Sequence, residues 1–163
     1  MSERKTLFRA EELATLSEWR FTHQHNPDAT RFTRSPGDLA GCVDMGVHLV
    51  RVPAGGQSSE FHSHEEDEEF VYILSGRAIA EIGEEAHEVG PGDLMVFPKN
   101  SPAHMMRNPF DADVVFLVAG TRAPIDICNY PRKNLRQYRV HGRREYVDAG
   151  QIRYPTIAPE KVT

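Results

Sequence analysis

From residue 43 onward, the chain consists of short β-type runs separated by Gly and Pro residues. Turn sequences such as Pro53-Ala-Gly-Gly56 and Gly90-Pro-Gly-Asp93 lie between these runs. Many short strands at regular spacing, with turn signals between them, are typical of an all-β barrel or sandwich. No long helical segment intervenes, which argues against a parallel α/β sheet. The expected strands are 46–52, 61–64, 69–74, 77–82, 86–89, 93–97, 103–107 and 114–118.

The N-terminal segment has a different texture. Residues 8–19 are rich in helix formers, and Leu13, Leu16 and Trp19 recur at a helical spacing, so the pattern predicts a short helix. Residues 20–41 are polar and contain turn-forming residues, which indicates an irregular arm or edge strands.

The C-terminal segment offers one further candidate strand, residues 125–130, and becomes charged and weakly patterned beyond Pro131. A chain of 163 residues suits one domain with a full hydrophobic core. We therefore expect an N-terminal helix and arm (1–42), a β-barrel (43–120) and a C-terminal extension that packs on the barrel (121–163).

Charge and composition exclude several classes of partner. The net charge of −5 leaves no basic face to neutralise nucleic-acid phosphates. No apolar run approaches the roughly 20 residues of a membrane span, and the N-terminus lacks the apolar core of a signal peptide. Cys42 and Cys128 belong to no motif and are expected to be reduced, buried thiols. A cytoplasmic protein that binds neither nucleic acid nor membrane is expected.

Three histidines point to a metal site. His62 and His64 stand at i and i+2, so an extended strand presents both imidazoles on one face. His104 follows downstream, and an acidic run occupies residues 65–69. Three imidazoles with one carboxylate suit a divalent transition metal better than calcium or magnesium, which prefer oxygen ligands. One such ion per chain is expected, and Fe, Mn, Ni, Zn and Cu all accept this ligand set.

Strand parity alone does not select the carboxylate within the acidic run. If Glu69 faces the barrel interior, the next inward side chains are Val71 and Ile73, which suit a core. If Glu68 faces inward instead, the alternate residues are also apolar. Both registers remain open at this point.

The segment from Gly56 to Gly76 resembles the first motif of the cupin superfamily. It reads Gly56, five residues, His62-x-His64, four residues, Glu69, six residues and Gly76. This spacing favours Glu69 over Glu68 as the ligand.

The segment from Gly92 to Asn108 resembles the second cupin motif, with Pro98 and His104 between them. It departs from the family pattern in one place, where Asn100 stands at the usual glycine and one extra residue follows. Asn tolerates the left-handed backbone conformation that a turn glycine supplies, so the loop is expected to close.

The resemblance covers about residues 43–120 and implies a double-stranded β-helix, or jelly-roll barrel, with the metal inside. The ligands that it implies are His62, His64, Glu69 and His104. Among these, Glu69 is the candidate catalytic residue, because a carboxylate can change its coordination and act as a base.

Two functions are compatible with such a site. The first is an enzyme that carries out dioxygenase, isomerase or lyase chemistry on a small organic acid, aromatic acid or sugar. The alternative is a non-catalytic cupin that binds a small, sugar-like ligand. A metal-free epimerase of nucleotide sugars would not need the full ligand set. The fold alone does not select the reaction.

The remaining histidines are expected to have no part in the site. His48 lies between apolar residues on an early strand and is read as structural, whether it faces the pocket or the outside. No role is assigned to His23, His25, His87 or His141.

The segments outside the barrel also predict an assembly. Unpaired sheet edges invite association unless they are covered, and the β-like runs 29–33 and 125–130 could cover an edge of the same barrel or of a neighbour. A two-fold homodimer, partly built from one of these runs, is therefore expected.

Overall fold

A six-stranded antiparallel sheet forms one wall of the molecule, whose computed structural model describes residues 5–154. Strands that are far apart in the sequence lie side by side in this sheet, as β10 (Val114–Thr121) does between β3 (Met45–Val52) and β5 (Glu69–Ser75). In spatial order, the strands are β1 (Trp19–His23), β2 (Asn26–Arg34), β3 (Met45–Val52), β10 (Val114–Thr121), β5 (Glu69–Ser75) and β8 (Leu94–Phe97).

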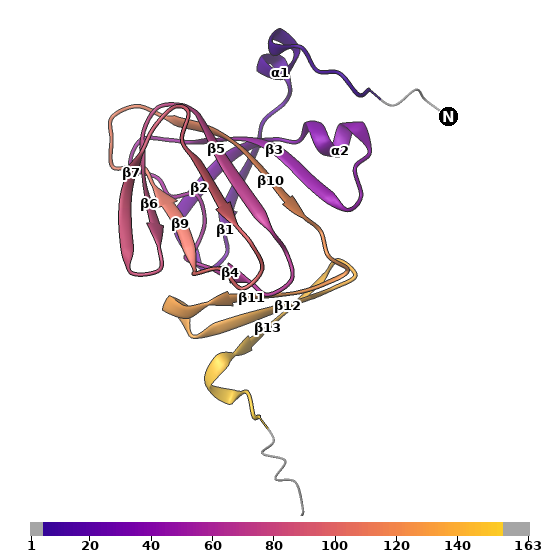
Figure 1. The fold of residues 1–163 in the computed structure, drawn as a ribbon, viewed down its shortest axis with the longest axis vertical. Coiled ribbons are helices and arrows are strands. Elements are labelled where there is room, and N and C mark those ends of the chain that lie inside the picture. Colours follow the sequence, from indigo (N-terminus) through magenta and orange to yellow (C-terminus); the bar gives the residue numbers. More distant parts are fainter. Residues whose placement is uncertain (1–4, 155–163) are drawn as a thin grey trace, which may run out of the picture.

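Two smaller sheets complete the barrel (Figure 1). The three-stranded sheet lies opposite the large one, and the four-stranded sheet crosses one end of the barrel. This arrangement confirms the expected all-β jelly-roll architecture. The three strands are β7 (Glu85–Val89), β6 (Ala78–Ile82) and β9 (His104–Arg107), and the four are β13 (Arg143–Asp148), β12 (Leu135–Val140), β11 (Ile125–Tyr130) and β4 (Ser63–His64).

Alternation along the strands places the hydrophobic core between the six-stranded and the three-stranded sheets. On β5, Val71 and Ile73 are buried, whereas Tyr72 and Leu74 are exposed. This strand therefore has the register in which Glu69, two residues before Val71, faces inward. The core consists of Val50, Val52, Val71, Ile73, Ala78, Ala80, Val89, Met95, Phe97, Met106, Val114 and Phe116.

Two turn positions require a left-handed backbone. Gly76 has φ of +75°, and a Cβ at this position would lie 2.2 Å from the carbonyl oxygen of Asp113, so only glycine fits. Asn100 has φ of +58°, and its N–H donates to the carbonyl of His64 at 3.0 Å. Asn100 thus takes the conformation that the sequence predicted for it and closes the loop over β4.

The N-terminal segment forms edge strands, one of the two alternatives expected for it, together with two short helices. The helix α1 spans only Ala10–Thr15, with the Arg9 N–H donating to the Glu12 side chain at 2.7 Å, and it buries no residue. Trp19 is not helical but opens β1 opposite Thr33, because the β1–β2 ladder offers hydrogen bonds that an isolated short helix does not match. A second short helix, α2 (Pro36–Ala40), ends at Gly41 with φ of +83°.

The weakly patterned C-terminal segment forms the β12–β13 hairpin, which sequence analysis missed. Its two-residue turn consists of His141 and Gly142, both with positive φ, as tight hairpin turns require. Gly142 indicates a turn, but the charged residues on both strands masked the alternation of apolar and polar residues that would indicate a hairpin. Two single-turn helices flank this hairpin, Pro131–Lys133 and Ala149–Gln151.

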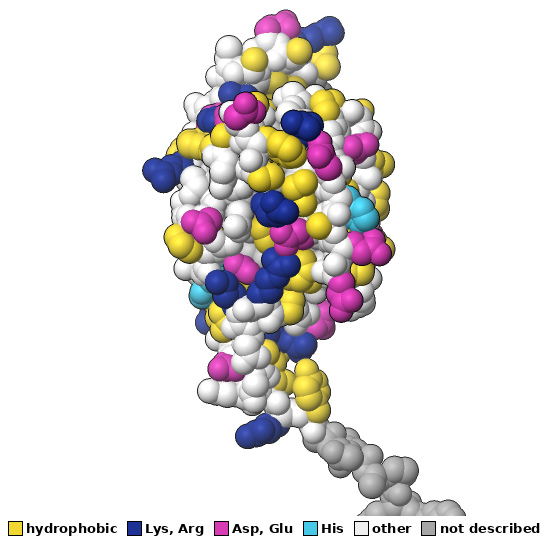
Figure 2. All heavy atoms as spheres, turned by 90° about the vertical axis from the view of Figure 1, so that its left-hand side faces the viewer, with side chains coloured by type: hydrophobic (Ala, Val, Ile, Leu, Met, Phe, Trp, Pro, Cys, Tyr) yellow, Lys and Arg dark blue, Asp and Glu magenta, His cyan; other side chains and the backbone are white. Residues whose placement is uncertain are grey.

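The surface over β6, β7 and β9 mixes both signs of charge, with apolar side chains between them (Figure 2). Glu81 of β6 pairs with Arg107 at 3.0 Å and with Arg132 at 2.7 Å. Both cysteines are free thiols, as expected, but only Cys128 is buried, whereas Cys42 is partly exposed. Among the described residues, no helix is long and apolar enough to cross a membrane.

Candidate metal site

His62 and His104 lie directly opposite each other on adjacent strand segments. The His62 N–H donates to the His104 carbonyl at 3.1 Å, and the His104 N–H donates to the His62 carbonyl at 2.7 Å. Residues that exchange both backbone hydrogen bonds present their side chains on the same face of the pair. The two imidazole centroids are accordingly 4.9 Å apart.

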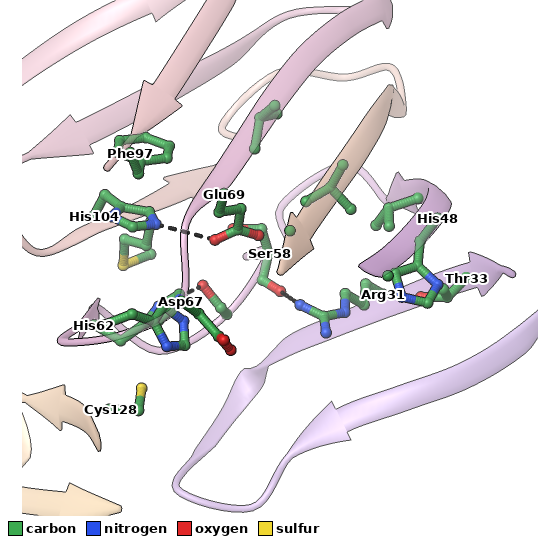
Figure 3. A pocket seen from close by; sticks show the side chains of 18 of the residues that line it. Arg31, Thr33, His48, Ser58, His62, Asp67, Glu69, Phe97, His104 and Cys128 are labelled. Carbon is green, nitrogen blue, oxygen red and sulfur yellow. Dashed lines mark hydrogen bonds and ion pairs between the residues drawn. The ribbon is translucent and has the colours of Figure 1, made fainter. Parts of the chain in front are cut away.

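Glu69, the first residue of β5, brings its carboxylate to this pair (Figure 3). Its Oε2 lies 3.3 Å from Nε2 of His104, and one ligand atom each from His62, Glu69 and His104 lie within 4.8 Å of one another. Glu68 is exposed and its backbone N–H donates to the Thr121 hydroxyl at 2.8 Å. The structure thus brings together three of the four residues that the sequence nominated as ligands.

His64 belongs to an adjoining cluster. Its Nδ1 lies 2.8 Å from Oδ2 of Asp126, and ligand atoms of His64, Asp67 and Asp126 lie within 4.8 Å of one another. The His64 and His62 rings are 5.0 Å apart between centroids and perpendicular. His64 therefore borders the three-residue cluster, with one of its two ring nitrogens already bonded.

All three histidines share one tautomeric constraint. Nδ1 of His62 lies 2.8 Å from the Glu60 carbonyl, and Nδ1 of His104 lies 3.2 Å from the Pro102 carbonyl. Carbonyl and carboxylate oxygens only accept, so each Nδ1 carries the proton and donates it, as Nδ1 of His64 does to Asp126. In each neutral ring, Nε2 keeps its lone pair, which is the arrangement that metal-binding histidines use.

The electrostatics set the protonation states of the cluster. Burial, followed by the nearby charges of His64 and His104, lowers the pKa of His62 to about 3, so this imidazole is neutral. Burial alone would raise the pKa of Glu69, but its close contact with His104 and the proximity of His62 and His64 lower it to about 2. A neutral imidazole and an ionised carboxylate are the forms that bind a metal.

The donor set fits a cation. With Nδ1 of His104 donating to Pro102, Nε2 of His104 faces the ionised Oε2 of Glu69 across 3.3 Å. Two lone pairs at this distance repel each other unless a proton or a metal ion lies between them. Nε2 of the neutral His62 ring is also left with a lone pair, and a proton bound to His104 does not satisfy it. The residues therefore suit a divalent transition metal.

The cluster lines a cavity of about 590 Å³. Phe97 stacks on His104 with 3.5 Å between ring centroids and 4° between planes, which fixes the imidazole. His48 also faces this cavity, and its Nδ1 lies 2.9 Å from the Ser35 hydroxyl. A volume of this size is typical of small-molecule sites.

Sequence analysis missed several cavity residues. Phe21 and His23 of β1 and Arg31 of β2 reach the cavity from a segment that was expected to form an irregular arm or edge strands, with no role in the site. Asp126, which is 1% exposed, comes from β11, and nothing in the sequence linked it to His64. Residues 19, 21 and 23 line the cavity at alternate positions of β1. This alternation of aromatic rings was the sequence signal for Phe21 and His23, but the polar residues around them concealed it.

Comparison with known proteins identifies the family. A family model described as "Cupin domain" matches residues 48–120. A crystal structure from Acidithiobacillus ferrooxidans shares 35% identity with the chain at a TM-score of 0.91, and the match covers 94% of this chain and 99% of that one. The chain belongs to the cupin superfamily. The A. ferrooxidans protein carries the name sugar phosphate isomerase as a provisional assignment.

A second cupin, named a sugar phosphate isomerase, comes from Silicibacter pomeroyi. It shares 27% identity at a TM-score of 0.77, and the match covers 85% of this chain and 92% of that one. A Thermotoga maritima protein, named a predicted oxalate decarboxylase, shares 16% identity at a TM-score of 0.58, over 67% of this chain and 95% of that one, and shows the fold alone. No curated protein matches this cupin.

Proposed function

We propose that this cupin is a metal-dependent isomerase that interconverts the aldose and ketose forms of a small phosphorylated sugar. The observation that carries the proposal is the group of three imidazoles with protonated Nδ1 atoms beside the ionised carboxylate of Glu69. The names of the A. ferrooxidans and S. pomeroyi proteins support the substrate class. The cavity of about 590 Å³ has room for such a substrate.

In this proposal, His62, His64, Glu69 and His104 hold one divalent transition metal. When bound, such an ion supplies Lewis-acid polarisation of the sugar's carbonyl and hydroxyl oxygens. The orienting contacts are supplied by the chain: Asp126 holds the His64 ring, and Phe97 holds the His104 ring.

Glu69 is the proposed proton acceptor. Aldose–ketose isomerisation moves one hydrogen between C1 and C2 and one between the attached oxygens, so the reaction needs no oxidant or second substrate. The ionised Glu69 carboxylate takes the proton from C2 and returns it to C1. The apolar walls contributed by Val71 and Phe116 limit water at this carboxylate.

Metal content and turnover test the proposal together. Elemental analysis of the purified protein should give about one transition-metal ion per chain, and NMR should show aldose–ketose interconversion with deuterium uptake from D₂O at the transferred position. Glu69→Gln should abolish uptake, whereas Glu66→Gln, at an exposed residue paired only with Lys99, should not. Metal and ligand binding without turnover of any sugar phosphate would replace the isomerase with a sugar-binding cupin.

A further inference from the structure

Arg31 of β2 extends into the cavity with an incomplete set of partners (Figure 3). Its Nη1 donates to the Ser58 carbonyl at 2.8 Å. Its Nε is buried and has no hydrogen-bond partner among residues 5–154, and no carboxylate in this range pairs with the guanidinium. Burial lowers the pKa of Arg31, and the nearby Arg144 lowers it further, whereas Glu69 and Tyr130 act in the opposite direction. A buried, unpaired guanidinium is costly, so a binding role is the physical reason to retain it.

Two other arginines of the cavity wall are neutralised by acidic partners. Arg122 pairs with Asp38 at 2.6 Å, and Arg139 pairs with Asp67. Arg31 has no such ion pair. Arg144 lines the same cavity, and burial together with the charges of His25 and Arg31 lowers the pKa of His23 to about 4. This end of the cavity therefore carries two arginines, and within residues 5–154 neither of them forms an ion pair with a carboxylate.

The guanidinium is also held in orientation. The Phe21 ring lies under it, with the centroid 4.9 Å from Cζ, and the Ser58 carbonyl occupies Nη1. The edge formed by Nε and Nη2 is left for a ligand. Such an edge presents two parallel N–H donors, which match two oxygens of a phosphate or carboxylate.

We propose that Arg31 binds the phosphate group of the substrate through Nε–H and Nη2–H, with Arg144 as a second positive charge at the same end. The substrate then spans the cavity, with its phosphate at Arg31 and its reacting carbons at Glu69. That the phosphate belongs to a sugar rests on the proposed function. The anion site itself stands on the geometry of Arg31.

Calorimetric titration of the metal-free protein with inorganic phosphate, at fixed ionic strength, tests the anion site without interference from the metal. The wild type should bind phosphate, and Arg31→Gln should weaken it at least about tenfold, as expected for loss of charged hydrogen bonds. Arg31→Lys keeps the charge but loses the two-donor edge, and should also bind more weakly than the wild type. Arg20→Gln is the matched control, because Arg20 is exposed and alternates with the cavity-lining residues of β1.

Circular dichroism first establishes that each variant is folded, and Arg31→Lys carries the test if Arg31→Gln is not. Equal phosphate affinity in the wild type and the folded Arg31 variant would overturn the proposal. Acetate binding as tight as phosphate binding would overturn the assignment to phosphate.

Different results would contradict the proposed anion site and the proposed isomerase activity. If the protein isomerises a sugar phosphate, Arg31→Gln should raise KM more than it lowers kcat, because the phosphate lies away from the reacting carbons. An unchanged KM would remove Arg31 from substrate binding and leave the isomerase intact. Loss of phosphate binding in Arg31→Gln, in a protein without isomerase activity, would uphold the anion site alone.

Discussion

Nδ1 of His64 donates to Oδ2 of Asp126 across 2.8 Å, although the two residues are 62 positions apart in the chain. Asp126 is 1% exposed, and its other oxygen, Oδ1, accepts from the N–H groups of Glu66 and Asp67 at 3.1 and 3.2 Å. Burial alone would raise the pKa of Asp126, but the bond from His64 lowers it to about 2. An ionised carboxylate therefore fixes the tautomer and direction of the His64 ring.

Asp126→Asn should weaken metal binding by about 10- to 100-fold, because the amide no longer fixes His64 Nδ1 as a donor. Competition with a chromogenic chelator measures the affinity. Glu65→Gln is a suitable control, since Glu65 is also an acidic residue close to β11 but contacts Asn129 and Arg136 rather than a histidine. Equal affinity in Asp126→Asn and the wild type would mean that His64 is not a ligand.

Glu69→Gln should weaken metal binding strongly, and Glu68→Gln should leave it nearly unchanged. Glu69 shares its face of β5 with buried residues and meets His104 at 3.3 Å, whereas Glu68 is exposed. The same chelator competition compares the pair. A greater loss in Glu68→Gln would contradict the ligand set.

Ile73→Ala should destabilise the protein by about 2–5 kcal/mol, because Ile73 is fully buried and its truncation leaves a cavity in the core. Leu74→Ala, at a neighbouring residue that is 45% exposed, should cost about 0.5 kcal/mol or less. Urea unfolding followed by fluorescence measures both free energies. The reverse order of destabilisation would mean that β5 is shifted by one residue.

Cys128 should react slowly with thiol reagents in the folded protein. Burial raises the pKa of its thiol to about 12, so little of the nucleophilic thiolate forms at mildly alkaline pH. In a Cys42→Ser variant, which retains only this thiol, labelling should accelerate on adding denaturant. Fast labelling of that variant without denaturant would show that the region around Cys128 opens readily.

The homodimer is still a proposal, and the structure narrows where its contact lies. The runs 29–33 and 125–130 pair within the chain, through β2 with β3 and through β11 with β4 and β12. The outer face of β5 and β8 instead exposes Tyr72, Leu74, Leu94 and Val96. Light scattering should give a mass about twice the 18.4 kDa of one chain, and Val96→Lys should reduce it. A wild-type mass near 18.4 kDa would exclude the dimer.

The barrel could be predicted from local sequence patterns, because apolar and polar residues alternate along its strands and Gly and Pro mark its turns. Residues 125–130 form β11 over the predicted range, and Asn100 has the predicted positive φ. The helix over 8–19 was wrong beyond Thr15, since the Leu13, Leu16 and Trp19 spacing does not reveal that residue 19 pairs with Thr33. Pairing between distant segments outweighed local propensity there.

The candidate site could also be predicted only in part, again because distant contacts are not visible in the sequence. The grouping of His62, Glu69 and His104 could be predicted, because the fixed spacing within the two cupin motifs places these residues on facing strands. The partner of His64 and the unpaired Arg31 were not, because each depends on contacts made by segments outside the motifs. The spacing of residues in the sequence does not show whether an arginine has an acidic partner in the folded chain.

The β1–β2 hairpin lies outside residues 48–120, the part matched by the family model, yet it supplies Phe21 and Arg31 to the cavity. Its strand β2 pairs with β3 of the barrel at three positions. Because the hairpin carries none of the candidate metal ligands, its cavity-lining residues can change while the histidines stay the same. A protein built this way can inherit its chemistry from one part of the chain and change its choice of substrate in another, so close relatives with identical ligands need not share a substrate.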